Sequence, residues 1–294
     1  MMTKRLCKSL RAMPFLSLLR LIVILLCFAT PSWATDRLPA RDVVQSGHSL
    51  TDDIMAPLAQ MVRATHMRGG RLDAATLPGS PMDWRWSNPT TPDIRQPSVL
   101  AQYDVLVLTE RVPLSRTLPF HDSLGWAARW ATHAWDSGGL STVLYASWVE
   151  TDSGPGSENP YNDPDRGLTF RVRLPIEMAG WQAILDHMNA SLPPEAPAVR
   201  MIPGPLIMAA AHDAITAGEA PGLSDIGDLF KDDIHLNPMG AYLIALAHYA
   251  VIYEADPRGL PHGVPSRGGP NAAQATWMQD LVWRVLTDDR AAGR

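Results

Sequence analysis

The chain has 294 residues and a formal net charge of −5, and 46% of its residues are hydrophobic. This composition excludes a disordered, collagen-like or coiled-coil protein and indicates a globular one. Residues 1–34 combine five basic side chains and no acidic one with an apolar run at 21–29 and the small residues Ser32 and Ala34. That pattern predicts a secretory signal peptide cleaved after Ala34. A retained N-terminal anchor is the alternative, although the apolar run is shorter than the roughly 20 residues of a membrane span.

The segment after the signal, residues 35–294, is predicted to be one secreted or periplasmic domain. It keeps 20 basic residues against 30 acidic ones, a net charge of −10, because the signal carries five basic side chains. A chain with this net negative charge repels polyphosphate and anionic lipid, which argues against nucleic acid or a membrane surface as a partner. Both cysteines, Cys7 and Cys27, lie in the signal. Disulfides, thiolate catalysis and cysteine-ligated metals are therefore not expected in the mature protein.

Short β-rich runs alternate with longer helical patterns along the rest of the chain. Strands are expected at 42–45, 103–109, 141–147 and 198–202. Helices are expected at 52–67, 122–135, 205–217, 238–253 and 272–287. This alternation predicts an open α/β sandwich, a parallel sheet with helices on both faces. In such sheets the chemistry gathers beyond the carboxyl ends of the strands.

The longest irregular stretch, residues 151–166, is rich in Gly, Pro, Asn and Asp and follows the expected strand at 141–147. Because it leaves a strand at its carboxyl end, we expect it to overhang the functional edge of the sheet as a loop or a lid.

Ser49 lies directly after the first expected strand, in Gly47-His-Ser-Leu-Thr-Asp52. A glycine there lets the backbone turn sharply, and the start of the following helix favours negative charge near the hydroxyl. The position therefore suits a nucleophile. A purely structural role remains open, with Ser49 or Thr51 as the N-cap of the helix.

A second motif, Asp232-Asp-Ile-His235, precedes a helix that Pro238 can open. A hydroxyl nucleophile needs a neutral imidazole to take its proton, and the imidazole needs an acceptor on its other nitrogen. His235 and Asp232 can supply both. Asp233 is a rival acceptor, and Asp-x-x-His alone also suits a metal site or a capped loop.

Taken together, Gly47-His-Ser-Leu50 and Asp232-Asp-Ile-His-Leu-Asn237 resemble the first and last blocks of the SGNH (GDSL-like) hydrolases. The resemblance implies a flavodoxin-like three-layer α/β/α sandwich and an esterase or deacetylase activity. It also implies Ser49 as nucleophile, His235 as general base and Asp232 as its orienting acid.

Two positions depart from the family pattern. His48 stands where the family has an Asp before the nucleophile, and it is expected to support the site or face the substrate. Thr109-Glu110-Arg111 replaces the block that carries the family's oxyanion-hole Asn. The remaining candidate donors are the backbone N–H groups of Ser49 and Gly79.

Four side chains complete the set of candidate site residues. Arg111 or Asn88 could replace the missing amide, while Glu110 and Arg111 could equally form a structural ion pair. Trp148, with Trp84 and Trp86, offers indole faces on which a sugar could stack; the alternative is that these tryptophans belong to the core.

No motif for a metal or cofactor accompanies these residues. The remaining histidines lack His-x-x-x-His spacing, and no glycine-rich phosphate loop follows a strand. The sequence therefore predicts a cofactor-free, metal-free serine esterase that removes a short acyl group from a glycan or another polar ester. The alternatives are an O-acyltransferase and a non-hydrolytic binding protein.

Overall fold

The computed structural model describes residues 38–65, 70–263 and 265–291, which belong to one compact unit, Leu38–Arg294. The predicted signal peptide, residues 1–34, and its cleavage site lie outside the described residues. None of the helices within the described ranges is long and apolar enough to cross a membrane.

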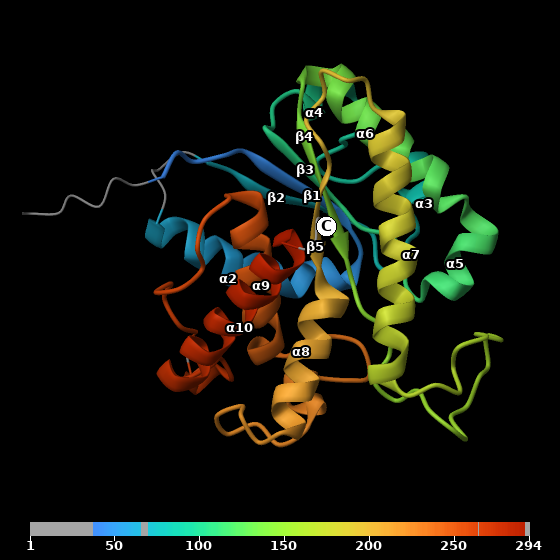
Figure 1. Cartoon of the computed structure of the whole chain (residues 1–294). Coiled ribbons are helices and arrows are strands. Elements are labelled where there is room, and N and C mark those ends of the chain that lie inside the picture. The colour runs from blue at the N-terminus through green and yellow to red at the C-terminus, as the bar shows by residue number, and fades with distance from the viewer. Residues whose placement is uncertain (1–37, 66–69, 264, 292–294) are drawn as a thin grey trace, which may run out of the picture. The chain divides into compact units, whose positions relative to one another are not determined.

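A five-stranded parallel sheet lies at the centre of this unit (Figure 1). Its strands are Val43–Gly47 (β1), Leu72–Thr76 (β2), Val105–Leu108 (β3), Ser141–Ala146 (β4) and Arg200–Pro203 (β5). They lie side by side in the order β2-β1-β3-β4-β5, which is the flavodoxin-like order. All residues of β1 and β3 are buried, as expected for strands that are covered on both faces.

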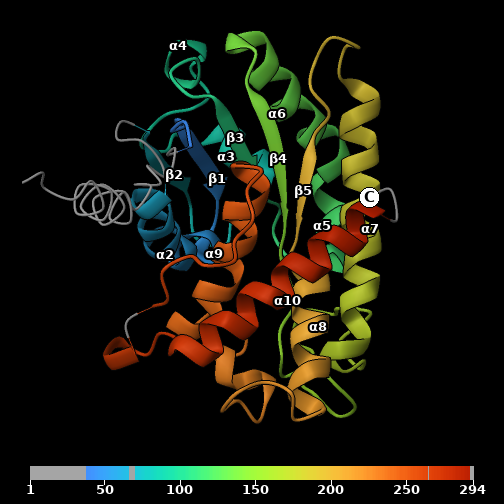
Figure 2. The same cartoon turned by 60° about the vertical axis from the view of Figure 1, so that its left-hand side comes forward.

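Helices cover both faces of the sheet. They are Ser49–Thr65 (α2), Met82–Ser87 (α3), Pro97–Leu100 (α4), Leu114–His121 (α5), Ser123–Gly138 (α6), Phe170–Ser191 (α7), Gly204–Thr216 (α8), Pro238–Ile252 (α9) and Ala272–Ala291 (α10). Short 3-10 helices occur at Ile226–Leu229 and Pro265–Arg267. α2 and α9 pack together on one face, α6 and α7 pack together on the other, and α10 packs on α8 and α9 (Figure 2). The predicted three-layer α/β/α sandwich is confirmed.

Some elements differ from the expected ones. β2 and α7 are absent from the sequence prediction, as are the short helices α3, α4 and α5. β2 is an edge strand in which Ala75 alone is fully buried, so its sequence lacks an apolar alternation. α7 contains Pro175 and buries the charged Arg173 and Glu177, which obscures its helical pattern. α2 begins at Ser49, three residues before the expected start.

The core lies between the sheet and its two helical layers. From Gly240 to Ile252 every residue of α9 is buried. Trp130 and Trp181 are buried in this core, whereas Trp126 and Trp135 are half-buried.

Candidate active site

Strand register brings the candidate residues to one edge of the sheet. Ser46 of β1 pairs with Leu108 of β3, so the segments that leave these two strands, to Ser49 and to Arg111, run side by side. Thr109 N–H extends this pairing by donating to the Ser46 carbonyl at 3.2 Å. The carboxyl ends of the parallel strands thus gather residues that are far apart in the sequence.

Ser49 is the first residue of α2, at the turn where β1 ends. The turn requires glycine at position 47, because a Cβ atom there would lie 2.1 Å from Thr51 Oγ1 and 3.2 Å from the Thr109 methyl group. The Thr51 N–H donates to the His48 carbonyl at 2.8 Å and closes the first turn. The Ser49 hydroxyl is therefore held at the start of the helix.

Ser49, His235 and Asp232 form one continuous hydrogen-bonded chain. His235 Nε2 lies 2.9 Å from Ser49 Oγ, and His235 Nδ1 lies 2.9 Å and 3.1 Å from the two carboxylate oxygens of Asp232. With Nδ1–H donating to Asp232, Nε2 is left as an acceptor for the hydroxyl proton of Ser49. The side chains of residues 186 positions apart in the sequence thus share one proton pathway.

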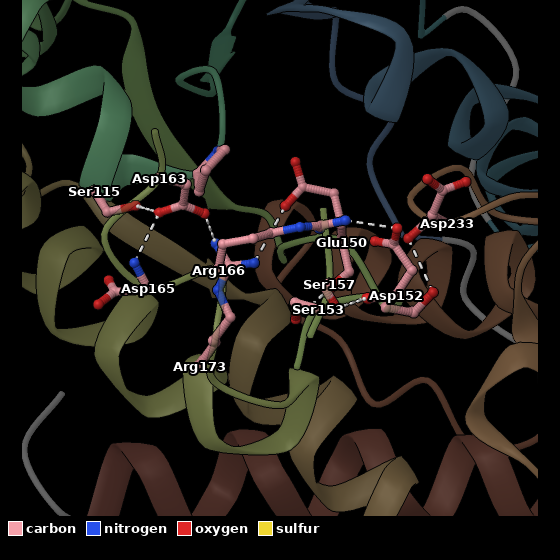
Figure 3. Close-up of polar contacts among 12 residues, drawn as sticks. Ser115, Glu150, Asp152, Ser153, Ser157, Asp163, Asp165, Arg166, Arg173 and Asp233 are labelled. Atoms are coloured by element: carbon pink, nitrogen blue, oxygen red, sulfur yellow. Dashed lines mark hydrogen bonds and ion pairs between the residues drawn. The ribbon is translucent and has the colours of Figure 1, made fainter. Parts of the chain in front are cut away.

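The Asp232 carboxylate is also bound by the backbone of its own loop. Its Oδ1 accepts from the N–H groups of Ile234 and His235 at 3.0 Å and 2.7 Å. Burial opposes ionisation of this carboxyl, but these backbone bonds and the His235 ring lower its pKa below the ordinary value. Asp233, the rival acceptor, instead offers its backbone carbonyl, which accepts from Thr151 N–H at 2.7 Å and from Thr151 Oγ1 at 3.0 Å (Figure 3).

The loop that carries Asp232 and His235 is fastened at both ends. Lys231 N–H donates to the His235 carbonyl at 2.9 Å, and the Lys231 ammonium pairs with Asp53 of α2 at 2.8 Å. Asn237 is the N-cap of α9, where its Oδ1 accepts from the N–H groups of Met239 and Gly240 at 2.9 Å and 3.1 Å. These contacts limit the freedom of the imidazole.

Trp148 is fully buried and contacts this loop from beneath. Its Nε1–H donates to the Ile234 carbonyl at 2.9 Å. The prediction that Trp148 contacts substrate is therefore wrong, because the indole is covered by the protein. Its role is to support the loop between Asp232 and His235.

His48 is buried, with 3% of its surface exposed, and does not face a substrate. Its Nδ1 accepts from Leu50 N–H at 3.4 Å, so its Nε2–H donates to the Glu110 carbonyl at 2.9 Å. Burial and the nearby Arg85 lower the pKa of His48 to about 4, which keeps the ring neutral. The substrate-facing prediction is corrected: His48 ties the nucleophile turn to the segment after β3.

A buried arginine that the sequence analysis missed lies beneath the same turn. Arg85 is 1% exposed; its Nε donates to Ser46 Oγ at 3.2 Å, and its other nitrogens donate to the carbonyls of Ser80 and Thr109. It thus links the ends of β1 and β3 to the loop after β2. Its only sequence signal is an arginine between two tryptophans, and a single sequence does not reveal its burial.

Glu110 is fully buried near Arg85. Its Oε1 accepts from the backbone N–H groups of Met82 and Arg111 at 3.0 Å and 2.6 Å. Burial raises the pKa of this carboxyl, against the opposing effect of Arg85. The two predictions for the Glu110 carboxylate, a contact with substrate and an ion pair with Arg111, are therefore wrong. The carboxylate does not reach a substrate, and it does not pair with the Arg111 guanidinium.

The candidate oxyanion donors differ in where they lie. Gly79 has the left-handed φ of 64° and an open position in the loop that follows β2, where Leu77 N–H donates to the Gly47 carbonyl at 3.1 Å. Asn88 is the C-cap of α3, and its amide nitrogen donates to the Trp84 carbonyl at 2.9 Å. The Asn88 amide is therefore turned to its own helix and does not replace the missing family amide. Arg111 remains half-buried at the functional edge.

The segment at 151–166 is anchored rather than loose. Arg166 pairs with Asp152 at 2.6 Å, and the buried Asp163 pairs with the buried Arg173 of α7 (Figure 3). Together with the bonds from Thr151 to the Asp233 carbonyl, these contacts tie the segment to α7 and to the loop that carries Asp232, so that it forms a wall beside the site.

Comparison with known proteins connects this architecture with several solved structures. No family model and no curated protein matches the chain. A DUF4886 family protein from Bacteroides uniformis matches 86% of this chain and 95% of its own, with a TM-score of 0.55 at 15% identity. A proposed SGNH hydrolase from Slackia heliotrinireducens matches 74% and 100%, with a TM-score of 0.45 at 16% identity.

A lipase/acylhydrolase from Enterococcus faecalis matches 71% of this chain and 93% of its own, with a TM-score of 0.42 at 13% identity. At these identities the likeness concerns the fold alone. Within the described part of the chain, no three His, Cys, Asp or Glu side chains are grouped as a metal site would require.

Proposed function

We propose that the protein is a serine esterase of the SGNH type, which cleaves a short acyl ester by acyl transfer through Ser49. The observation that carries the proposal is the hydrogen-bonded chain from Ser49 Oγ through His235 to Asp232, with 2.9 Å at each of its two links. Each bond has the length and the partners that a nucleophile, a general base and an orienting acid require.

In the first half of the reaction, Ser49 Oγ attacks the ester carbonyl carbon while His235 Nε2 takes the hydroxyl proton. The Asp232 carboxylate stabilises the imidazolium that forms. The carbonyl oxygen becomes an oxyanion, for which the backbone N–H groups of Ser49 and Gly79 are the proposed donors. Collapse breaks the bond to the alcohol, which leaves with the proton from His235.

In the second half, a water molecule gives its proton to His235 and attacks the acyl-enzyme. The acyl group leaves as a carboxylic acid and Ser49 regains its proton. A glycan or another polar ester is the proposed substrate class, and export through the segment at 1–34 is the proposed route to it.

The test uses a short-chain aryl acetate. Ser49→Ala should lower kcat by at least about a thousandfold, since the residual rate then comes from binding and oxyanion contacts alone. Ser98→Ala, on the exposed face of α4, is the matched control and should keep the original rate. Equal rates for Ser49→Ala and the original protein would refute the proposal.

A fluorophosphonate separates the esterase from a protein that only binds a ligand. An activated Ser49 should be labelled in the original protein and not in Ser49→Ala. Absence of labelling together with absence of hydrolysis would favour the binding protein.

A further inference from the structure

A cavity of about 410 Å³ opens at the segment that follows β3. It is lined by the end of the segment after β3, by α5 and by the anchored segment at 151–166, and its lining includes Arg111, Ser115, Arg116, Phe120, His121 and Tyr161. None of these residues belongs to the chain of Ser49, His235 and Asp232.

The cavity is next to that chain because of the strand register. Arg111 follows Leu108 by three residues, just as Ser49 follows Ser46, and Ser46 and Leu108 are paired neighbours in the sheet. The bond from His48 to the Glu110 carbonyl holds the two segments together at the residues that precede Ser49 and Arg111. The Arg111 wall of the cavity therefore directly follows the residue that His48 joins to the nucleophile turn.

The cavity is positively charged, although the chain as a whole is acidic. Within the described ranges, neither the Arg111 nor the Arg116 guanidinium forms an ion pair with a carboxylate, and no carboxylate lines the cavity. Three acids close to the lining already have partners. Glu110 accepts from the Met82 and Arg111 N–H groups, Asp83 pairs with His121 at 3.0 Å, and Asp163 accepts from Ser115 at 2.7 Å. The cavity thus has two guanidinium groups whose charge is not neutralised locally.

Aromatic rings form the rim of the same cavity. Tyr161 is 69% exposed and Phe120 is 80% exposed, and the Arg116 guanidinium lies 4.6 Å from the centre of the Tyr161 ring. Because Asp163 ties this part of the wall to Ser115 and Arg173, Tyr161 is presented on an anchored segment (Figure 3). A flat ring beside a cation suits a sugar that bears an anionic group.

We propose that Arg111 and Arg116 form an anion subsite, so that the preferred substrate is an ester of a glycan that carries an anionic group, such as a carboxylate, close to the acylated hydroxyl. This proposal rests on the proposed esterase function and specifies its substrate class. A guanidinium binds a carboxylate through paired N–H donors, and two of them beside the ester would orient the substrate as well as attract it.

The test compares two acetylated sugars that differ only at C6, where one has a carboxylate and the other a hydroxymethyl group: an acetylated methyl glucuronoside and the methyl glucoside acetylated at the same hydroxyl. We expect kcat/KM to be at least about tenfold higher for the glucuronoside, and this preference to decrease as salt screens the charges. In the double variant Arg111→Gln/Arg116→Gln the ratio of the two kcat/KM values should fall towards one. The acetylated glucoside 6-sulfate, as a third substrate, distinguishes a carboxylate from a sulfate as the bound group.

The matched control is Arg63→Gln/Arg284→Gln, which removes the same net charge from exposed positions on α2 and α10. It should retain the ratio of the original protein. Equal kcat/KM for the charged and neutral sugars, or a ratio that the cavity variant and the control change alike, would overturn the anion subsite while leaving the esterase intact.

A binding measurement separates the two proposals when neither sugar is hydrolysed. Calorimetry on the Ser49→Ala protein should show that methyl glucuronoside binds at least about tenfold more tightly than methyl glucoside. The two arginine substitutions should abolish this difference in affinity. Equal binding of the two sugars would refute the subsite, whereas preferential binding without any hydrolysis would refute the esterase alone.

Discussion

At the scale of single residues, the site depends on which nitrogen of His235 carries the proton. The Asp232 carboxylate lies against Nδ1, so the tautomer with Nδ1–H is favoured and Nε2 faces the Ser49 hydroxyl as an acceptor. Asp232 is itself held by two backbone N–H groups, which keep it ionised and fixed in orientation. The acid therefore acts by determining the state of the imidazole.

This argument predicts the effect of Asp232→Asn. An amide nitrogen at this position can donate to His235 Nδ1 and would favour the tautomer with the proton on Nε2, which cannot accept the hydroxyl proton. We expect kcat for the aryl acetate to fall by about 10³ to 10⁴. Steady-state kinetics on the purified variant measures it.

Asp233→Asn is the control for that substitution, because Asp233 contributes its backbone carbonyl to the site and its side chain is exposed. Its kcat should stay within about threefold of the original value. A larger loss for Asp233→Asn than for Asp232→Asn would mean that Asp233, and not Asp232, orients the imidazole.

At the scale of elements, the start of α9 connects stability with the site. Asn237 caps this helix, and its Nδ2 also donates to the carbonyls of Asp228 and Phe230 at 2.8 Å and 3.3 Å. Gly240 has no space for a side chain, because a Cβ atom there would lie 2.2 Å from the Leu229 carbonyl oxygen. The close packing of this helix start against the preceding loop determines where His235 is placed.

Asn237→Ala should therefore affect both stability and catalysis. Loss of the cap should lower the free energy of unfolding by about 1–2 kcal/mol, and the loosened loop should lower kcat by about tenfold. Urea unfolding and aryl acetate kinetics measure the two effects.

Asn271→Ala offers a matched comparison at the start of α10, where Asn271 Oδ1 accepts from Gln274 N–H at 3.0 Å. It should lose stability and keep its kcat. If both cap variants lowered kcat equally, the loss would reflect general destabilisation and the link from Asn237 to His235 would be wrong.

At the scale of the whole molecule, several buried charged side chains lie near the functional edge. Besides Arg85 and Glu110, the packed side of α7 buries Glu177, whose Oε1 accepts from Leu114 N–H at 2.9 Å. Burial raises the pKa of Glu177 to about 8. The native state therefore keeps a proton that the unfolded state, with a carboxyl pKa of 4.5, releases at lower pH.

This pKa difference determines how stability depends on pH. Between about pH 4.5 and 8 the native state binds more protons than the unfolded state at this group, so its contribution to stability decreases as pH rises through the window. Glu177→Gln keeps the acceptor for Leu114 N–H and removes the titration. We expect the variant to gain a few degrees in Tm relative to the original protein between pH 5 and pH 8, since about 1 kcal/mol shifts Tm by about 2–4 °C at this size.

Thermal unfolding at several pH values measures this gain, and Glu219→Gln, at an exposed position after α8, is the control. A Tm difference between Glu177→Gln and the original protein that did not change with pH would contradict the assignment.

The local sequence was sufficient to predict much of the fold. Nearly unbroken apolar runs indicated β3 and β4, and the alternation of strands with helices indicated the three-layer sandwich, because periodicity and burial are coupled within each element. β2 and α7 escaped prediction for a physical reason: an edge strand buries little, and α7 buries charged groups whose partners come from other elements.

The candidate site likewise contains residues whose role the sequence predicted and residues whose role it did not. Ser49, Asp232 and His235 were predicted because their neighbouring residues form short motifs at the ends of elements. Whether a polar side chain faces solvent or the interior depends on contacts between distant segments, so only the tertiary structure assigned His48, Trp148 and Asn88 to supporting roles.

Burial also depends on the neighbours of a side chain in space. A single sequence does not specify them, and it therefore gave no warning of the buried Arg85 or of the cavity that brings Arg111 and Arg116 together.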